Sequence, residues 1–240
     1  MNDLSHTFKR VKIFADGAHK EEMLGLFRHS FISGFTTNPT LMKKAGIADY
    51  RAFAKEILSV ITDKPISFEV FSDDFAEMKR QAGEIASWGA NVYVKIPVTN
   101  TRGQSSVDLI EELSKEGVKI NVTAMMTPEQ VEKVLPALRK GPAGYVSVFA
   151  GRIADSGQDP LPVMKKVLQM IRPYPHLELI WASPRELLNL IQADAIGCHI
   201  ITVTGDLLRK LPALGKDLDQ FSLETVRMFY EDAKSAGYDL

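Results

Sequence analysis

The chain contains eight short apolar runs, often rich in β-branched residues, and segments with helical periodicity lie between most of them. The predicted strands are Val11–Ala15, Phe31–Thr36, Ile66–Phe71, Val92–Pro97, Val118–Thr123, Tyr145–Phe149, Leu177–Trp181 and Cys198–Val203. Eight units in 240 residues average about 30 residues each, which is the size of one βα module. This alternation of strands and helices predicts βαβ units and a parallel sheet.

A parallel sheet of eight strands either closes into a (β/α)8 barrel or stays open and doubly wound. The intervening helices are predicted at Asp73–Trp88, Gln104–Glu116, Thr127–Leu138 and Asp159–Ile171. An open sheet favours a glycine-rich phosphate turn after its first strand, and the residues here, Phe14–Ala18, do not form one. We therefore predict a single-domain (β/α)8 TIM barrel over residues 1–240, with Ser222–Ala236 as an additional C-terminal helix.

Composition excludes several classes of function. The net charge is −1 with no basic stripe, so we expect no nucleic-acid partner. The single cysteine, Cys198, excludes an intrachain disulfide and fits a reduced compartment. No histidine has metal-ligand spacing, so no metal site is predicted. Met1–Arg10 does not resemble a signal peptide, and no apolar run is long enough to span a membrane, so we expect a cytoplasmic protein with no membrane partner.

Lys95 is the first candidate for chemistry because it interrupts an otherwise buried strand. One interpretation is a strand-end lysine whose amine reaches water. However, Val94, Ile96 and Pro97 flank it closely, so we expect a partly desolvated amine. Desolvation favours the neutral form of a lysine, and only the neutral amine can attack a carbonyl to form a Schiff base.

Polar side chains also occur at the ends of four other predicted strands. They are Asp16, Glu69, the pair Asn121 and Thr123, and Ser147, which shares a strand face with Phe149. Each of them alone could be a cap, a turn former or a satisfied buried group. Together they indicate a site, because function in a closed barrel lies at the C-terminal ends of the strands.

Two arginines follow the sixth and seventh predicted strands. Arg152 and Arg185 are either solvated loop residues or a phosphate clamp, since guanidinium binds phosphate through two hydrogen bonds. Ser183 lies beside Arg185 near a predicted helix start, where anions are favoured. Earlier in the chain, Asn38-Pro39 is typical of a turn that leads into a helix.

At this point the chain resembles the transaldolase family, including its short members and the related fructose-6-phosphate aldolases. The resemblance extends from Ile13 to about Tyr230. The motifs that carry it are Gly34-Phe35-Thr36-Thr37-Asn38-Pro39-Thr40, Val94-Lys95-Ile96-Pro97-Val98-Thr99, Asn121-Val122-Thr123-Ala124, Gly151-Arg152-Ile153 and Ala182-Ser183. Several motifs in the right order make a chance match very improbable.

The resemblance implies a (β/α)8 barrel with a Schiff-base lysine on the fourth strand, which Lys95 matches, and no metal or other cofactor. Asp16 then matches the acid–base aspartate, and Glu69 with Thr123 matches the pair that positions a catalytic water. The implied contacts to the dihydroxyacetone unit are Asn38, Asn121 and Ser147, to which we add Thr36 and Phe149 as substrate-binding residues. The implied phosphate-binding residues are Arg152, Ser183 and Arg185.

Two positions distinguish the branches of this family. The aldolase branch typically has glutamine where this chain has Glu69 and tyrosine where it has Phe149. Both positions therefore match the transaldolase branch. Pro184 is a departure, because family members usually have an aromatic residue between the serine and the basic residue. This affects the details of phosphate recognition.

The predicted function is transfer of a dihydroxyacetone unit from a ketose phosphate to an aldose phosphate through a Schiff base on Lys95. By resemblance, the sugars are sedoheptulose 7-phosphate or fructose 6-phosphate as donor, and glyceraldehyde 3-phosphate or erythrose 4-phosphate as acceptor. The alternatives are direct aldol cleavage of fructose 6-phosphate and a non-catalytic sugar-phosphate binding protein. Short family members tend to form pentamers or decamers, so a homo-oligomer with contacts through the C-terminal helix is expected.

Overall fold

The computed structural model of the chain describes residues 8–239, in which eight parallel strands close into a barrel. The strands pair in chain order, and β8 pairs back with β1 to complete the ring. Their bounds are β1 Lys12–Asp16, β2 Ile32–Thr36, β3 Ile66–Glu69, β4 Val92–Pro97, β5 Ile120–Met125, β6 Gly144–Val148, β7 Leu177–Trp181 and β8 Ile200–Thr204. The predicted (β/α)8 fold is confirmed, and each strand overlaps its predicted run.

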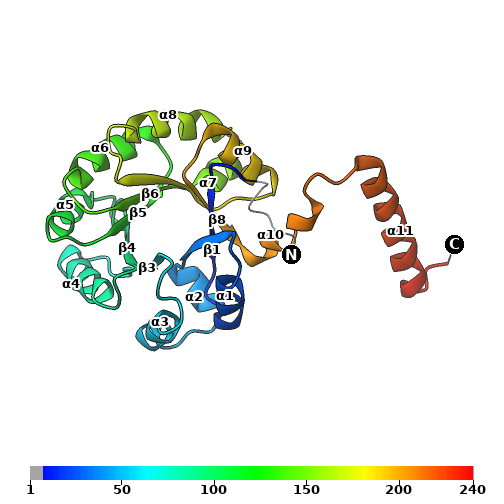
Figure 1. Cartoon of the computed structure of the whole chain (residues 1–240), viewed down its shortest axis with the longest axis horizontal. Coiled ribbons are helices and arrows are strands. Elements are labelled where there is room, and N and C mark those ends of the chain that lie inside the picture. Colours follow the sequence, from blue (N-terminus) through cyan, green and yellow to red (C-terminus); the bar gives the residue numbers. More distant parts are fainter. Residues whose placement is uncertain (1–7, 240) are drawn as a thin grey trace.

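The helices surround the strands on the outside of the barrel (Figure 1). Their bounds are α1 Lys20–Phe27, α2 Pro39–Lys44, α3 Tyr50–Leu58, α4 Phe75–Ala86, α5 Val107–Lys115, α6 Pro128–Leu138, α7 Ala150–Asp155, α8 Leu161–Ile171, α9 Leu188–Ile196 and α10 Gly205–Leu208, followed by a short 3-10 turn at Leu211–Ala213. Caps fix several of the starts. Asp74 caps α4, and Thr127 forms a reciprocal capping box with Gln130 at the start of α6.

Two apolar clusters hold the barrel together. The larger one fills the space between the sheet and the helices. The smaller one fills the barrel interior with Phe14, Tyr93, Tyr145, Ile180, Ala182 and Ile200. Gly34 of β2 makes room for it, since a Cβ there would lie 2.6 Å from the Phe14 ring.

The inner cluster determines where polar groups can lie. Side chains two residues apart on a strand share a face. Asp16, Lys95 and Ser147 each follow an aromatic residue of the inner cluster by two positions. They therefore form the next layer of the barrel interior, above the aromatic rings and toward the C-terminal ends of the strands.

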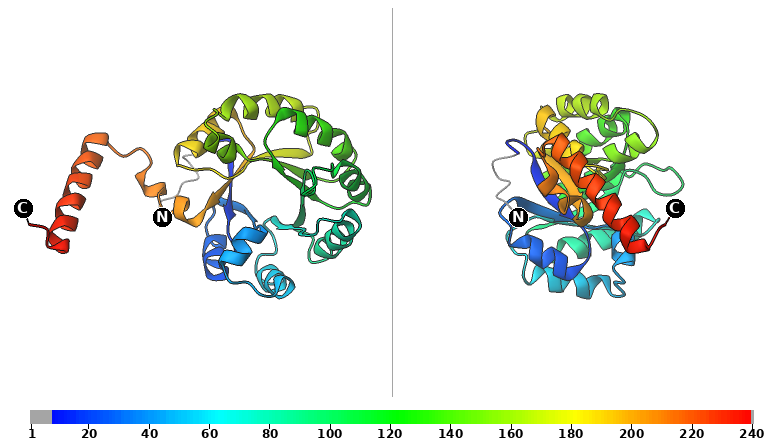
Figure 2. Two further views of the ribbon diagram at one scale, coloured as in Figure 1. Left: turned by 180° about the vertical axis from the view of Figure 1, so that it is seen from behind. Right: turned by 90° about the vertical axis from the view of Figure 1, so that its right-hand side faces the viewer.

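The predicted additional C-terminal helix is present as α11, Leu218–Ala236, and it stands away from the barrel (Figures 1 and 2). It begins four residues earlier than predicted, because Asp217 caps it by accepting a hydrogen bond from the Gln220 amide. No residue of α11 is buried, and Val226, Phe229 and Tyr230 are each at least 60% exposed.

Within residues 8–239, no helix has both the length and the apolar character needed to span a membrane. Most of the segment Met1–Arg10, which bears on the expected localisation, lies outside the described residues.

Candidate active site

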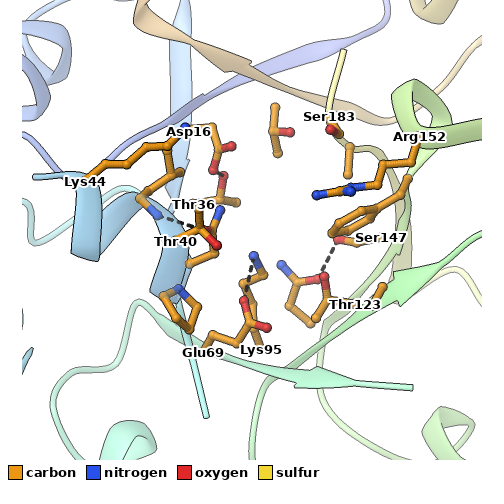
Figure 3. Close-up of a pocket in the computed structure, with 18 of the residues that line it drawn as sticks. Asp16, Thr36, Thr40, Lys44, Glu69, Lys95, Thr123, Ser147, Arg152 and Ser183 are labelled. Atoms are coloured by element: carbon orange, nitrogen blue, oxygen red, sulfur yellow. Dashed lines mark hydrogen bonds and ion pairs between the residues drawn. The ribbon is translucent and has the colours of Figure 1, made fainter. Parts of the chain in front are cut away.

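A cavity of about 480 Å³ opens at the C-terminal end of the barrel (Figure 3). All of the side chains that the sequence indicated line this one cavity. They are Asp16, Thr36, Asn38, Glu69, Lys95, Asn121, Thr123, Ser147, Phe149, Arg152, Ser183 and Arg185. Residues from seven strands or the loops that follow them thus converge on a single space.

Lys95 lies within the cavity wall with only 6% of its surface exposed. Its Nζ donates a hydrogen bond of 2.9 Å to the Thr37 carbonyl and lies 3.3 Å from Glu69 Oε2. Strands β3 and β4 pair Glu69 directly with Lys95, so the register sets this contact. The amine is thereby desolvated, oriented, and placed beside a carboxylate that can exchange protons with it.

Glu69 is the last residue of β3, two residues before the predicted end of that strand, and Tyr50 fixes its backbone. The Tyr50 hydroxyl accepts a hydrogen bond from the Glu69 amide at 2.9 Å and donates one to the Glu69 carbonyl at 3.1 Å. Burial raises the pKa of Tyr50, which keeps the phenol protonated and able to donate. Tyr50 therefore ends the strand at the point where the Glu69 side chain faces the amine.

Asp16 faces the same space from β1. Its Oδ1 accepts a hydrogen bond of 2.7 Å from the Thr36 hydroxyl. Burial raises the pKa of Asp16, although the charge of Lys95 and the Thr36 hydrogen bond act in the opposite direction. A carboxyl with a raised pKa is suited to exchanging protons near neutral pH. Thr36 is thus placed as a partner of Asp16.

Asn121 and Ser147 are linked in a buried chain of hydrogen bonds. The Ser147 hydroxyl donates to Asn121 Oδ1 at 2.7 Å, and Asn121 Nδ2 donates to the Ser67 hydroxyl at 3.0 Å. Each side chain fixes the rotamer of the next, which is how a preorganised polar surface is held inside a barrel. Ser67 was not predicted from the sequence, although it shares a strand face with Glu69.

The Thr123 hydroxyl is buried and has no hydrogen-bond partner among the described residues. A buried hydroxyl needs a partner, and Thr123 is one of the residues that line the cavity. The next residue, Ala124, has φ of 63°, and the pairing of β5 with β6 shifts register there. The strand therefore bends away directly after Thr123, which leaves the hydroxyl at the rim of the barrel interior.

Asn38 caps the start of α2, which the sequence predicted from Asn38-Pro39. Its Oδ1 accepts the Leu41 amide at 2.9 Å, so its Nδ2 remains to donate toward the cavity it lines. Across the barrel, Phe149 packs against the inner apolar cluster while also lining the cavity. One wall of the cavity is therefore an aromatic surface without a hydroxyl group.

The end of the cavity near β6 and β7 is built by a close approach of two loops. A Cβ on Gly151 would lie 1.5 Å from the Ser183 carbonyl oxygen, so only glycine fits at the start of α7. Ser183 itself has φ of 62°, a strained conformation for a residue other than glycine. The Ser183 side chain reaches the cavity from this loop, on the side that also carries Arg152 (Figure 3).

The two arginines differ in what they contact. Arg185 donates to both carboxylate oxygens of Asp155, with its Nε 2.8 Å from Oδ1, and its Nη1 donates to the Ser183 hydroxyl at 2.8 Å. The Asp155 hydrogen bonds raise the pKa of Arg185. No ion pair or side-chain hydrogen bond of Arg152 is present within residues 8–239. Arg152 is thus the arginine with its donors available to an anion.

Other residues of the cavity wall were not predicted. They are Pro39, Thr40, Leu41, Lys44, Ala124, Ala182 and Thr202. Lys44 and Thr40 lie on the same side as Asp16 and Thr36, opposite Arg152 (Figure 3). Lys44 carries no sequence signal of its own, because an exposed lysine near a helix end is common. Thr202 could have been found, since it follows Ile200 by two positions on β8.

The fold and the cavity together define a TIM-barrel protein whose C-terminal face carries a buried lysine, two carboxylates and a cationic end. Between residues 8 and 239, no group of three or more His, Cys, Asp or Glu side chains is arranged to hold a metal ion. The available chemistry is that of an amine nucleophile with proton donors and acceptors around it.

Comparison with known proteins places the chain in a family. The profile of the family described as Transaldolase/Fructose-6-phosphate aldolase matches residues 13–240. A probable transaldolase of Dehalococcoides mccartyi is 37% identical over 202 residues, which cover 84% of this chain and 90% of that protein. A probable transaldolase of Thermoanaerobacter sp. is 38% identical over 228 residues, which cover 95% and 99%. The chain belongs to the transaldolase/fructose-6-phosphate aldolase family, as its sequence motifs predicted.

Solved structures at low identity agree with the fold alone. The tryptophan synthase alpha subunit of Campylobacter jejuni superposes with a TM-score of 0.55 at 14% identity, over 85% of this chain and 90% of that one. A putative fructose-1,6-biphosphate aldolase of Coccidioides immitis gives 0.53 at 14% identity, over 83% and 77%.

Proposed function

We propose that this protein is a transaldolase, which transfers a dihydroxyacetone unit between sugar phosphates through a Schiff base on Lys95. The observation that carries the proposal is the environment of the amine. Lys95 is buried, lies 3.3 Å from Glu69, and shares its cavity with Asp16 and with the uncommitted guanidinium of Arg152. Probable transaldolases among the relatives support the same activity.

The first half of the reaction forms an imine. The neutral Lys95 amine attacks the ketone carbon of a ketose phosphate, and the carbinolamine loses water. Glu69 and Thr123 move protons in this step through a bound water, for which the unpartnered Thr123 hydroxyl offers an anchor. Asn38, Asn121 and Ser147 hold the hydroxyls of the three-carbon unit.

The second half breaks and remakes a carbon–carbon bond. Asp16 takes the proton from the C4 hydroxyl, the C3–C4 bond breaks, and the electron pair moves into the iminium to give an enamine. An aldose phosphate leaves. The enamine then attacks the aldehyde of a second aldose phosphate, Asp16 returns the proton, and hydrolysis of the new imine releases the product. The iminium is the electron acceptor, so this chemistry needs no metal.

The phosphate of the substrate lies at the opposite end of the cavity from Lys44 and Asp16. Arg152 supplies charged donors there, and the Ser183 hydroxyl adds another, since it accepts from Arg185 and keeps its own proton to donate. The donor sugars we propose are sedoheptulose 7-phosphate and fructose 6-phosphate, and the acceptors are glyceraldehyde 3-phosphate and erythrose 4-phosphate.

Borohydride trapping tests the proposal. Incubation with fructose 6-phosphate and borohydride should add a reduced three-carbon or six-carbon unit to the peptide that contains Lys95, as measured by mass spectrometry. Lys95→Met, which is apolar and similar in length, should give no adduct while its thermal unfolding stays cooperative. An adduct on another lysine would refute the site, and no adduct in the parent chain would leave a non-catalytic binding protein as the better account.

An acceptor-omission assay separates transfer from direct aldol cleavage. A transaldolase releases little free dihydroxyacetone from fructose 6-phosphate when no aldehyde is added, whereas an aldolase releases it continuously. Phe149 favours transfer, because its ring lines the cavity and offers no proton to the enamine. Fast release without an acceptor would assign the chain to the aldolase reaction.

We also propose that the protein is a homo-oligomer that buries α11 against a second copy. Val226, Phe229 and Tyr230 are spaced so that they share one face of the helix, and all three are exposed. Light scattering should give a mass that is a multiple of 26.7 kDa, and a Val226→Glu and Phe229→Glu double variant should be smaller. A monomeric parent chain would refute this proposal.

A further inference from the structure

Thr202 on β8 is a cavity residue that neither the sequence motifs nor the mechanism uses. It lines the cavity and is only 5% exposed. Its hydroxyl makes no hydrogen bond to any residue between 8 and 239. A nearly buried hydroxyl that faces a polar cavity without a protein partner is suited to bind a polar group of the substrate.

The strand geometry places this hydroxyl within the barrel interior. Ile200 belongs to the inner apolar cluster, and Thr202 follows it by two positions on the same face. Thr202 pairs with Phe14 of β1, and Asp16 pairs with Thr204. Thr202 therefore lies on the strand next to Asp16 and faces the barrel interior in register with Phe14.

The order of strands around the barrel indicates which part of a bound substrate lies near Thr202. β8 lies between β1, which carries Asp16, and β7, which leads into Ser183. In the proposed reaction, Asp16 acts on the hydroxyl of the reacting carbon, and the phosphate lies beside Ser183 and Arg152. β8 is therefore the strand nearest to the part of the sugar between these two points.

We propose that the Thr202 hydroxyl binds the substrate hydroxyl on the carbon between the reacting carbon and the phosphate end. In the acceptor this is the hydroxyl next to the aldehyde, and in the donor it is the hydroxyl on C5. Thr202 is then a specificity-determining residue, which selects 2-hydroxyaldehyde phosphates over aldehyde phosphates without that hydroxyl. This inference rests on the proposed function and deepens it.

The test pairs an enzyme change with a matching substrate change. The acceptors are D-glyceraldehyde 3-phosphate and 3-phosphooxypropanal, which has the same phosphate and lacks only the hydroxyl next to the aldehyde. With sedoheptulose 7-phosphate held at saturation, erythrose 4-phosphate release gives kcat/KM for each acceptor. Because the mechanism has two half-reactions, this quantity reports only the acceptor half.

Thr202→Val keeps the shape and is favoured in strands. It should lower kcat/KM for D-glyceraldehyde 3-phosphate by about 2- to 12-fold, the range expected for one neutral hydrogen bond. For 3-phosphooxypropanal it should change kcat/KM less than about 2-fold, because no partner is lost. Thr202→Ser keeps the hydroxyl and should stay close to the parent chain for both acceptors.

Two results would overturn the inference. Equal losses of kcat/KM for both acceptors would show that Thr202 shapes the cavity without binding this hydroxyl. No loss of kcat/KM for either acceptor would show that Thr202 does not contact the substrate. Failure of the proposed function gives a different pattern, in which the parent chain transfers to neither acceptor, and that result rejects both proposals. Thermal unfolding of each variant identifies losses that come from misfolding.

Discussion

The unequal surroundings of Arg152 and Arg185 predict unequal effects when each is removed. A hydrogen bond to a charged group contributes about 1.5–3 kcal/mol, so Arg152→Ala should lower kcat/KM for D-glyceraldehyde 3-phosphate by about 10- to 150-fold. Arg185 already donates to both oxygens of Asp155 and to Ser183, which leaves few donors for a phosphate. Arg185→Ala should therefore lower kcat/KM less, by about 2- to 12-fold, the range for one neutral hydrogen bond, which would be lost through a less ordered Ser183.

The assay compares D-glyceraldehyde 3-phosphate with unphosphorylated D-glyceraldehyde as acceptors, at a saturating donor concentration. The ratio of the two kcat/KM values isolates phosphate recognition, since the aldehyde chemistry is common to both acceptors. Arg152→Ala should reduce this ratio strongly, and Arg185→Ala only slightly. Asp155→Asn is the matched control, because Asp155 pairs directly with Arg185, whereas its charge acts on Arg152 only at longer range.

If Arg185 acts by holding Ser183, Asp155→Asn and Arg185→Ala should have similar small effects, and the double variant should not add them. The reasoning would be refuted by an Arg185→Ala loss as large as that of Arg152→Ala. It would also be refuted if Arg152→Ala lowered kcat/KM equally for both acceptors, because the guanidinium would then serve something other than the phosphate.

Four further predictions concern the candidate site. Asp16→Asn should still form the trapped adduct with fructose 6-phosphate but should not cleave the carbon–carbon bond, and loss of trapping would place Asp16 earlier in the reaction. Burial raises the pKa of Asp16, so this base should become protonated at a higher pH than an ordinary aspartate. A profile of kcat/KM against pH should therefore show the acidic loss of activity at a correspondingly higher pH. Phe149→Tyr should raise the rate at which free dihydroxyacetone is released without an acceptor, relative to the rate of transfer to an added aldehyde. An unchanged ratio of these two rates would show that Phe149 does not determine the choice between release and transfer. Gly151→Ala should reduce both thermal stability and use of phosphorylated acceptors, because its Cβ would meet the Ser183 carbonyl oxygen; a variant with parent-like melting and kinetics would contradict the packing argument.

The barrel was predictable because its signals are local and repeated. Each strand was marked by a short apolar run, and α6 by the helical periodicity of Thr127–Leu138. The start of α11 was missed because Asp217 caps an earlier turn that lacks a strong apolar pattern. The short helices α7 and α10 were also not predicted, since four to six residues carry too little periodicity.

The candidate site was predictable where polar residues interrupt strands and less so where contacts cross the fold. Lys95 and Glu69 are conspicuous in apolar runs, and the parallel register then places them side by side. The pair between Asp155 and Arg185 joins the end of α7 to the loop after β7, 30 positions further along the chain, and no spacing rule indicates it. The left-handed backbone at Ser183 was hidden because glycine or asparagine is the usual signal for that conformation.

The distribution of roles around the barrel has a consequence for how such a protein can change its substrate. The amine and its two carboxylates lie on β1, β3 and β4, whereas the proposed phosphate contacts all come from one stretch of chain, residues 151–185, after β6 and β7. The proposed phosphate recognition is therefore a separable module. Exchange of that single segment, with the Gly151 and Ser183 contact kept intact, is the shortest engineering route to a carbon–carbon bond-forming catalyst for aldehydes that carry no phosphate.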